Sequence, residues 1–138
     1  MRVLIDTNVV LDYVAKREPY APQAYQIVKM CADKKITGGI AAHTITNIFY
    51  ILRKEMSIEE RKAALLKLCR VFTVVGVDIA KILSALENEN FNDLEDCLQD
   101  ECADDFLADY IITRNINDFK NGKIEAIEPG RFLSIVKR

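Results

Sequence analysis

Acidic and small polar residues follow a short apolar run at the start of the chain. Asp6, Thr7 and Asn8 come directly after the apolar residues of a predicted strand at 2–6. In open α/β sheets, ligands bind in the crevice beyond the carboxyl ends of the strands, so Asp6 stands where a binding site is expected. The alternative is that Asp6 only caps the helix that follows, because Asp and Asn are favoured at helix N-caps.

A second group of acids lies at the start of a helix predicted over 95–107. Asp93 and Asp96 are three residues apart and face the same way if both lie in or beside the first turn. Acids there also stabilise the helix dipole and cap the unpaired N–H groups of the first turn, which is a purely structural alternative for Asp93 and Asp96. A solvated acidic helix face accounts for the remaining acids, which are Asp100, Glu101, Asp104 and Asp105.

The third segment repeats the design of the first. A predicted strand at 109–113 ends in Thr113, Arg114 and Asn115, and Asp118 follows shortly afterwards. The polar ends of two parallel strands and the acidic helix start are therefore expected to converge on one pocket. An Asx-rich turn over 113–118 is the structural alternative, since Asn and Asp favour turns.

A metal ion would make such a pocket stable. Two unit charges about 4 Å apart repel by roughly 4 kcal/mol at an effective dielectric near 20, so clustered carboxylates favour a bound cation. Mg²⁺ or Mn²⁺ is expected, because hard divalent ions select oxygen ligands and keep waters that leave room for a phosphate and an attacking water. The single histidine, His43, has no histidine partner and is not among the expected catalytic residues.

The pattern of elements predicts an α/β domain. Near-continuous apolar strands separated by helices indicate a three-layer α/β/α fold with a central, mostly parallel sheet, formed by one domain over 1–138. Strands are expected at 2–6, 72–77, 109–113 and 124–127. Helices are expected at 8–16, 20–34, 41–55, 57–70, 78–88, 95–107 and 129–136.

The net charge, the cysteines and the length of the apolar runs limit the functions and the cellular compartment that are expected. The net charge of −2 gives no global cationic field, so any binding of nucleic acid must be local or assisted by a metal ion. Four cysteines at unrelated spacings are expected to be reduced core thiols. No apolar run is long enough to span a bilayer and no signal peptide is expected, which together predict a cytoplasmic protein without a membrane partner.

The run 48–52 is apolar nearly all round, so part of it is expected to face a second subunit of a homodimer or another partner.

Taken together, the three segments resemble the PIN domain, a family of metal-dependent nucleases that includes toxins of toxin–antitoxin pairs, among them the VapC-like toxins. The run 3–8 matches the family's opening hydrophobic-Asp-(Thr/Ser)-Asn signature. Asp96, with Ala103 seven residues later, resembles the helix that supplies the third acid. The run 113–119 resembles the closing Thr-x-Asp-x-x-Asp-Phe motif.

Two positions depart from the family pattern. Asn47 stands where the second acid, a Glu, is common, and Asn115 stands at the position of the fourth acid. An Asn keeps an oxygen ligand but loses the negative charge, so weaker metal binding is expected. Asp93 or Asp118 is a possible replacement for the missing charge.

The resemblance implies hydrolysis of an RNA phosphodiester by a metal-bound water. Asp6 and Asp96 would be the main metal ligands, with Asp93 and Asp118 as further candidates. Asn47 and Asn115 would share in catalysis, and Thr7 and Thr113 would orient ligands or substrate. Arg114 would contact a substrate phosphate, which a guanidinium can bind bidentately, and a surface salt bridge is the structural alternative. The implied partners are RNA and an antitoxin protein. The alternative is a catalytically weak or inactive PIN module that binds RNA or a protein partner.

Overall fold

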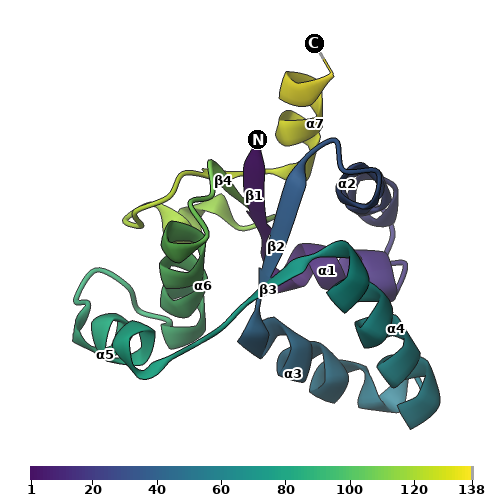
Figure 1. Ribbon diagram of the computed structural model, residues 1–138, viewed down its shortest axis with the longest axis horizontal. Helices are drawn as coiled ribbons and strands as arrows, with labels where there is room; N and C mark the ends of the chain where they lie inside the picture. Colours follow the sequence, from purple (N-terminus) through teal and green to yellow (C-terminus); the bar gives the residue numbers. More distant parts are fainter. Residues whose placement is uncertain (138) are drawn as a thin grey trace.

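A five-stranded parallel sheet forms the centre of the molecule in the computed structural model, which describes residues 1–137 (Figure 1). Its strand order is β3-β2-β1-β4-β5, and every neighbouring pair is parallel. The strands are β1 (Arg2–Ile5), β2 (Thr37–Ala41), β3 (Thr73–Val75), β4 (Tyr110–Ile112) and β5 (Ala126–Ile127). The α/β fold is therefore confirmed, and the sheet is parallel throughout rather than mostly so.

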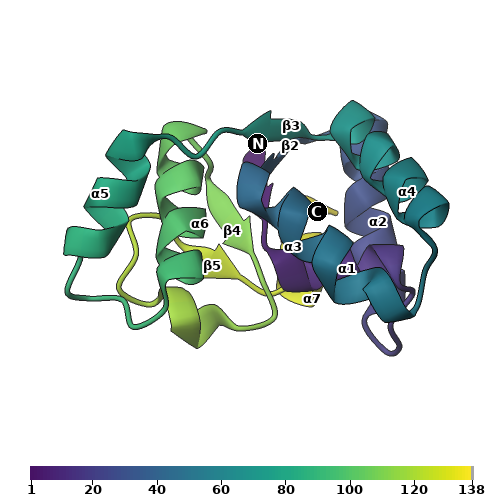
Figure 2. The same ribbon diagram turned by 90° about the horizontal axis from the view of Figure 1, so that it is seen from below.

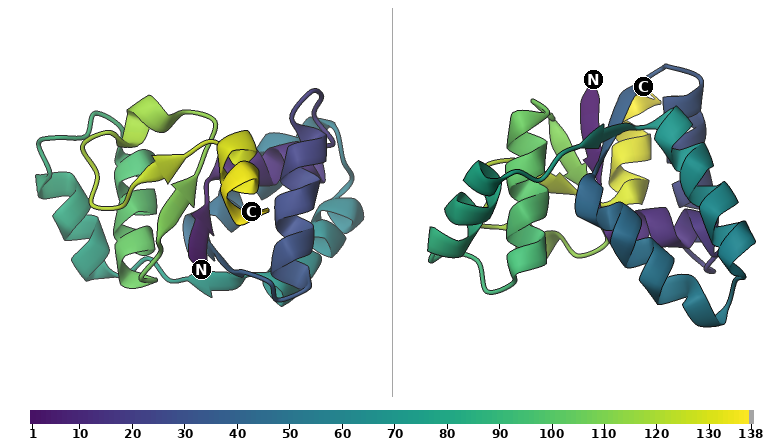
Figure 3. Two further views of the ribbon diagram at one scale, coloured as in Figure 1. Left: turned by 90° about the horizontal axis from the view of Figure 1, so that it is seen from above. Right: turned by 60° about the horizontal axis from the view of Figure 1, so that its bottom comes forward.

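Helices cover both faces of this sheet. On one side lie α1 (Thr7–Val14), α2 (Ala21–Ala32), α3 (Ala42–Ile51), α4 (Ile58–Val71) and α7 (Pro129–Val136). On the other side α6 (Leu94–Asp105) packs on the sheet and α5 (Ile79–Glu87) packs on α6. Short 3₁₀ turns follow α3 at Leu52–Lys54 and β4 at Ile116–Phe119. Figure 1 and the right view of Figure 3 show the N-terminus and α7 at the same end of the sheet.

The strand β2 is absent from the sequence prediction, which treated Gly38 and Gly39 as a break before the next helix. The two glycines are in the strand because neighbouring side chains approach its backbone closely. A Cβ on Gly38 would lie 2.5 Å from the Cys31 sulfur and 2.9 Å from the Phe72 ring, and one on Gly39 would lie 2.8 Å from the Phe106 ring. Glycine weakens the strand signal of a sequence, but here it lets a ring pack on each face of the sheet.

The alternation of side chains along the strands builds two cores. Val3, Ile5 and Ile112 point into the larger core beneath α1, α2, α3, α4 and α7. Leu4 and Ile111 point into the smaller core beneath α6. Because both faces are buried, the strands are apolar almost without interruption, as a doubly covered parallel sheet requires.

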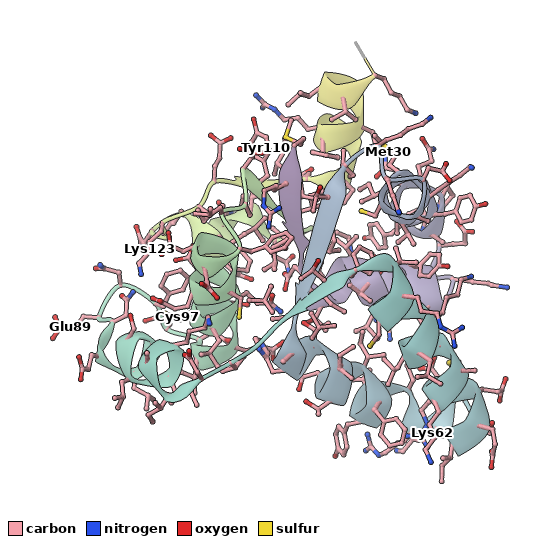
Figure 4. The ribbon with its side chains drawn as sticks, viewed as in Figure 1. Met30, Lys62, Glu89, Cys97, Tyr110 and Lys123 are labelled. Atoms are coloured by element: carbon pink, nitrogen blue, oxygen red, sulfur yellow. The ribbon has the colours of Figure 1, made fainter. Side chains whose placement is uncertain are left out.

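Two acids of α6 are not solvated, contrary to the sequence prediction. Asp100 and Glu101 are buried, and the Asp100 carboxylate accepts hydrogen bonds of 3.0 and 3.1 Å from the backbone N–H groups of Lys123 and Ile124. Figure 4 shows Lys123 beside α6, where its Nζ lies 3.0 Å from Glu101 Oε1. These acids anchor the loop between the 3₁₀ turn and β5. The cysteine prediction is also wrong at one position, since Cys69 is exposed while the other three are buried.

The parallel strands place their carboxyl ends at one edge, which faces the viewer in Figure 2. There the starts of α1, α3 and α6 meet the segment after β4. Asp6 N–H donates to Ile112 O at 2.9 Å, which ties the end of β1 to the end of β4. Within residues 1–137, no helix is both long and apolar enough to cross a membrane.

Candidate metal and phosphodiester site

Asp6 lies buried at the carboxyl end of β1 and caps α1. Its Oδ1 accepts a hydrogen bond from the Thr7 N–H at 2.8 Å, and its Oδ2 accepts one from the Thr113 hydroxyl at 2.8 Å. Burial raises the pKa of Asp6 to about 6, with smaller increases from the Glu95 and Asp118 carboxylates, although both hydrogen bonds act to lower it. The capping role is thus present, and the remaining lone pairs of a destabilised carboxylate are left for a cation.

A buried polar cluster lies next to Asp6 and links α1, α3 and α6. The Thr7 and Thr44 hydroxyl oxygens are 2.9 Å apart, and the Gln99 amide nitrogen donates to them at 3.1 and 2.9 Å respectively. Gln99 is fully buried, and its Oε1 has no partner among the described residues. This cluster, which sequence reasoning missed, fixes the relative positions of the three helix starts that surround the site.

Asp96 is half-buried in the first turn of α6 and faces the same edge as Asp6. Its pKa is raised to about 7, chiefly by burial and in addition by the carboxylates of Asp93, Asp6, Asp118 and Glu95. Asp93 is the N-cap of α6, and its Oδ1 accepts from the Asp96 N–H at 2.9 Å. Its structural role is therefore the one that the cap alternative predicted, while its charge still acts on Asp96.

Asp118 lies in the 3₁₀ turn after β4, and its charge acts on both Asp6 and Asp96. The structure therefore brings three of the expected acids, from three separate segments, to one edge of the sheet. Their mutual repulsion is the condition under which a cation is favoured.

Glu95 also reaches this edge and was not predicted as a site residue. Its Oε1 lies 3.4 Å from the Thr7 hydroxyl, which donates to it. His43, at the start of α3, lies near the backbone and carboxylate of Glu95, and burial lowers the pKa of its ring. Neither ring nitrogen of His43 makes a hydrogen bond within residues 1–137.

The two asparagines at the usual acidic positions differ in their surroundings. Asn47 is half-buried one turn after Thr44, on the same face of α3 that meets Thr7. Asn115 is exposed in the segment that follows β4, three residues after the end of the strand, and its N–H donates to the Thr113 hydroxyl at 3.1 Å. Both side-chain amides are without a hydrogen-bond partner in the described part of the chain.

Arg114 does not point freely toward the acids. Its Nε donates to Asp12 Oδ2 at 2.7 Å, and its guanidinium lies 4.0 Å over the Tyr20 ring. Asp12 is almost fully buried, so this carboxylate depends on Arg114 for neutralisation. The alternative of a salt bridge therefore describes Arg114 better than contact with a substrate phosphate.

The donor set fits a hard divalent ion held by few protein ligands. In the chain as described, no three His, Cys, Asp or Glu side chains are close enough together to form a closed metal cage. Mg²⁺ does not need one, because it is usually bound by one or two carboxylates and completes its shell with water and phosphate oxygens. Asp6 and Asp96, with raised pKa values and free lone pairs, match that requirement.

The residues that sequence reasoning missed carried weak signals. Glu95 directly precedes Asp96, and Gln99 follows Asp96 at a spacing of three, which places it on the same helix face. Thr44 precedes Asn47 by three residues in the same way. Each is a common residue at a common spacing, so only the fold identifies it.

Comparison with known proteins gives a family and a set of structural relatives. The model of the PIN domain family matches residues 2–117. No curated protein matches the chain. A structure of VapBC2 from Rickettsia felis, bound to a DNA fragment from its promoter, matches with a TM-score of 0.69 and 18% identity over 93% of this chain and 98% of that chain.

Two further structures share the architecture. VapC20 of Mycobacterium tuberculosis, described as a toxin that cleaves the sarcin–ricin loop, has a TM-score of 0.62 and 13% identity over 79% of this chain and 86% of that one. FitAcB of Neisseria gonorrhoeae has a TM-score of 0.62 and 13% identity over 93% of this chain and 98% of that one. At these identities the likeness to solved structures is one of fold. With a family match across most of its length, the chain belongs to the PIN domain family.

Proposed function

We propose that the protein is a metal-dependent endoribonuclease that hydrolyses RNA phosphodiester bonds with Mg²⁺ or Mn²⁺. The observation that carries this proposal is the pair Asp6 and Asp96, two carboxylates from separate elements whose pKa values rise to about 6 and about 7 at one edge of the sheet. A site that makes two ionised carboxylates costly favours a cation between them. Family membership supports nuclease chemistry at that cation.

Each residue of the site has a proposed task. Asp6 and Asp96 hold the ion, and Asp118 adds negative charge that favours it. A bound divalent ion supplies a nucleophilic water at neutral pH and stabilises charge on the phosphate. Asn47 and Asn115 offer amide oxygens and N–H donors that orient the attacking water and the phosphate. Thr7 and Thr113 hold the Asp6 carboxylate in place through hydrogen bonds of 2.8 Å.

A direct test compares RNA cleavage by the wild-type protein, Asp6→Asn, Asp96→Asn and the control Asp105→Asn, each with Mn²⁺, Mg²⁺ or EDTA. Asp105 ends α6 on its exposed side, pairs with Lys81 and lies away from the acid edge. Cleavage is expected only with metal, and only in the wild type and the control. Cleavage that survives in EDTA, or in both site variants, would contradict the proposal.

We also propose that the protein is the toxin component of a toxin–antitoxin pair acting in the cytoplasm, where its RNA substrate occurs. Structures of VapBC2 and FitAcB support a protein partner. An apolar groove of about 540 Å³ lies between the end of α1, the start of α2 and α4, and it suits an amphipathic antitoxin helix. Its lining residues are Tyr13, Val14, Lys16, Glu18, Ala21, Pro22, Tyr25, Ala64 and Lys67.

A homodimer is the proposed assembly. Within the run 48–52, Ile48 and Leu52 are buried in the core, whereas Tyr50 and Ile51 are exposed. A second apolar face lies on α5, where Ile79, Leu83 and Leu86 recur at helical spacing and are exposed. Sedimentation at high protein concentration tests the assembly, and a strictly monomeric mass would contradict it.

The second candidate function is a PIN module that binds RNA or a protein without cutting. The observation in its favour is the presence of Asn47 and Asn115 at two usual acidic positions, which removes two negative charges from the ligand set. In that case the protein would bind RNA with equal affinity with and without metal, and no ion would yield cleavage products.

A further inference from the structure

A polar pocket of about 360 Å³ lies between α1, the start of α2, the segment that follows β4 and the start of α7. Its volume falls in the range of roughly 300–1,000 Å³ that is typical of small-molecule pockets. Asn115 lines it, and Asn115 N–H is bound to the Thr113 hydroxyl that also holds Asp6. The other lining residues are Val9, Asp12, Tyr20, Gln23, Ala24, Arg114, Glu128, Pro129 and Gly130.

Arg114 forms a fixed, flat wall of this pocket. Asp12 holds its Nε at 2.7 Å and its Nη2 at 3.4 Å, while Tyr20 supports one face of the guanidinium at 4.0 Å. The side chain is therefore ordered before any ligand arrives. Because Arg planes and aromatic rings are the groups on which RNA bases stack, the wall suits a planar base.

The charge of the lining disfavours a phosphate. Arg114 is neutralised by the buried Asp12, and Glu128 adds a further carboxylate, so the three charged groups sum to a net negative charge. A phosphate would be repelled, whereas an uncharged group that donates hydrogen bonds would be attracted.

The hydrogen-bonding groups of the lining select among the bases. The Glu128 carboxylate forms no hydrogen bond or ion pair with any residue from 1 to 137, and the Gln23 and Asn115 amides are equally free there. Guanine is the RNA base that presents two adjacent donors, N1–H and the 2-amino group, to a single carboxylate. An amide N–H can donate to its O6 at the same time.

We propose that this pocket binds a guanine base of the RNA close to the cleaved phosphate. Glu128 recognises the base by accepting hydrogen bonds from its N1–H and 2-amino groups. This inference depends on the proposed nuclease function only in that the guanine is taken to belong to an RNA chain. It assigns Arg114 to base stacking, in place of the phosphate contact expected from the sequence.

Nucleotide binding to the metal-free protein in EDTA tests the pocket independently of catalysis. The probes are GMP, IMP, AMP, CMP and UMP, which carry the same phosphate, so that differences report the base alone. Affinity is followed by NMR through the side-chain amide signals of Gln23 and Asn115. GMP is expected to bind about tenfold or more tightly than the others, the discrimination typical of a bidentate contact. IMP, which lacks the 2-amino group, is expected to lose that advantage.

The variant Glu128→Gln is expected to lower the affinity for GMP to that for AMP. The control is Glu125→Gln, which should leave the affinity for GMP unchanged because Glu125 is an exposed acid outside this pocket. Equal affinity for all five nucleotides, or a GMP preference that survives in Glu128→Gln, overturns the proposal. If the protein prefers GMP but cleaves no RNA, the guanine pocket is supported and the nuclease proposal is contradicted. If it cleaves RNA without preferring GMP, the nuclease proposal is supported and the guanine pocket is contradicted.

Discussion

Replacement of Asp6 by Asn is expected to stabilise the metal-free protein. The pKa of Asp6 rises from 3.8 to about 6 in the fold, a shift of about two units, so the ionised carboxylate costs about 3 kcal/mol at neutral pH. Asn keeps the acceptor for the Thr7 N–H but cannot accept from the Thr113 hydroxyl, a loss of about 1 kcal/mol. The net gain is about 2 kcal/mol, or roughly 6 °C in Tm for a domain of this size.

The same substitution is expected to remove stabilisation by metal. A ligand that binds only the folded state adds about 2.7 kcal/mol at one hundred times its Kd, so Mn²⁺ should raise the Tm of the wild type substantially. Asp6→Asn removes one of the two proposed ligand charges, and its Tm should hardly respond. Thermal unfolding followed by circular dichroism, in EDTA and across a Mn²⁺ titration, measures both effects on the same samples.

The control for this experiment is Asp33→Asn, at the end of α2. Asp33 is exposed and, among residues 1–137, pairs only with Lys29 at 3.1 Å, so its replacement should change stability by less than about 0.5 kcal/mol. A metal-free Tm that falls in Asp6→Asn would refute the view that its buried charge is a cost. An equal Mn²⁺ response in Asp6→Asn and wild type would refute its role as a ligand.

Three further outcomes follow from the same physical reasoning. The raised pKa of Asp6 means that the folded state holds a proton more tightly than the unfolded chain. The free energy of unfolding in EDTA should therefore fall as the pH rises from about 4 to about 7. Urea titrations should show this decrease in the wild type and a smaller one in Asp6→Asn. Gly39→Ala should lose about 1–3 kcal/mol in the same assay, because the new Cβ would lie 2.8 Å from Phe106, whereas Gly76→Ala, in open space, should be nearly neutral. Ser57→Ala should lose about 1 kcal/mol, because it removes the cap of α4, and an unchanged denaturation midpoint would contradict that.

The fold was largely predictable because most strands carry a continuous apolar signal. The predicted strands at 2–6 and 109–113 contain β1 and β4, the two strands that carry Asp6 and Thr113 at their ends. The strand β2 was not predictable in the same way, since its sequence Thr-Gly-Gly-Ile-Ala has the composition of a turn. Its glycines are explained by rings of Phe72 and Phe106 that come from distant parts of the chain, and a local pattern does not contain that information.

The candidate site could be predicted where strand ends and helix starts mark it. Asp6 and Asp96 could be proposed as site residues because each acid interrupts a regular pattern at an element boundary. Thr44 and Gln99 could not be found, because a buried polar residue inside an amphipathic helix looks like any other until its partners are known. Arg114 shows the opposite failure: its sequence neighbours suggested a substrate contact, whereas its partner Asp12 lies on α1, far away in the sequence.

The two asparagines at usual acidic positions leave the local charge high, because other acids reach the same edge. The carboxylates of Asp6, Asp93, Glu95 and Asp118 all raise the pKa of Asp96. These acids surround the site without forming a closed cage of three, so a cation between Asp6 and Asp96 would be attracted strongly and chelated weakly. We therefore expect the substrate phosphate to complete the coordination shell. Metal affinity should then rise when RNA is bound, and by thermodynamic linkage RNA affinity should rise equally when metal is bound.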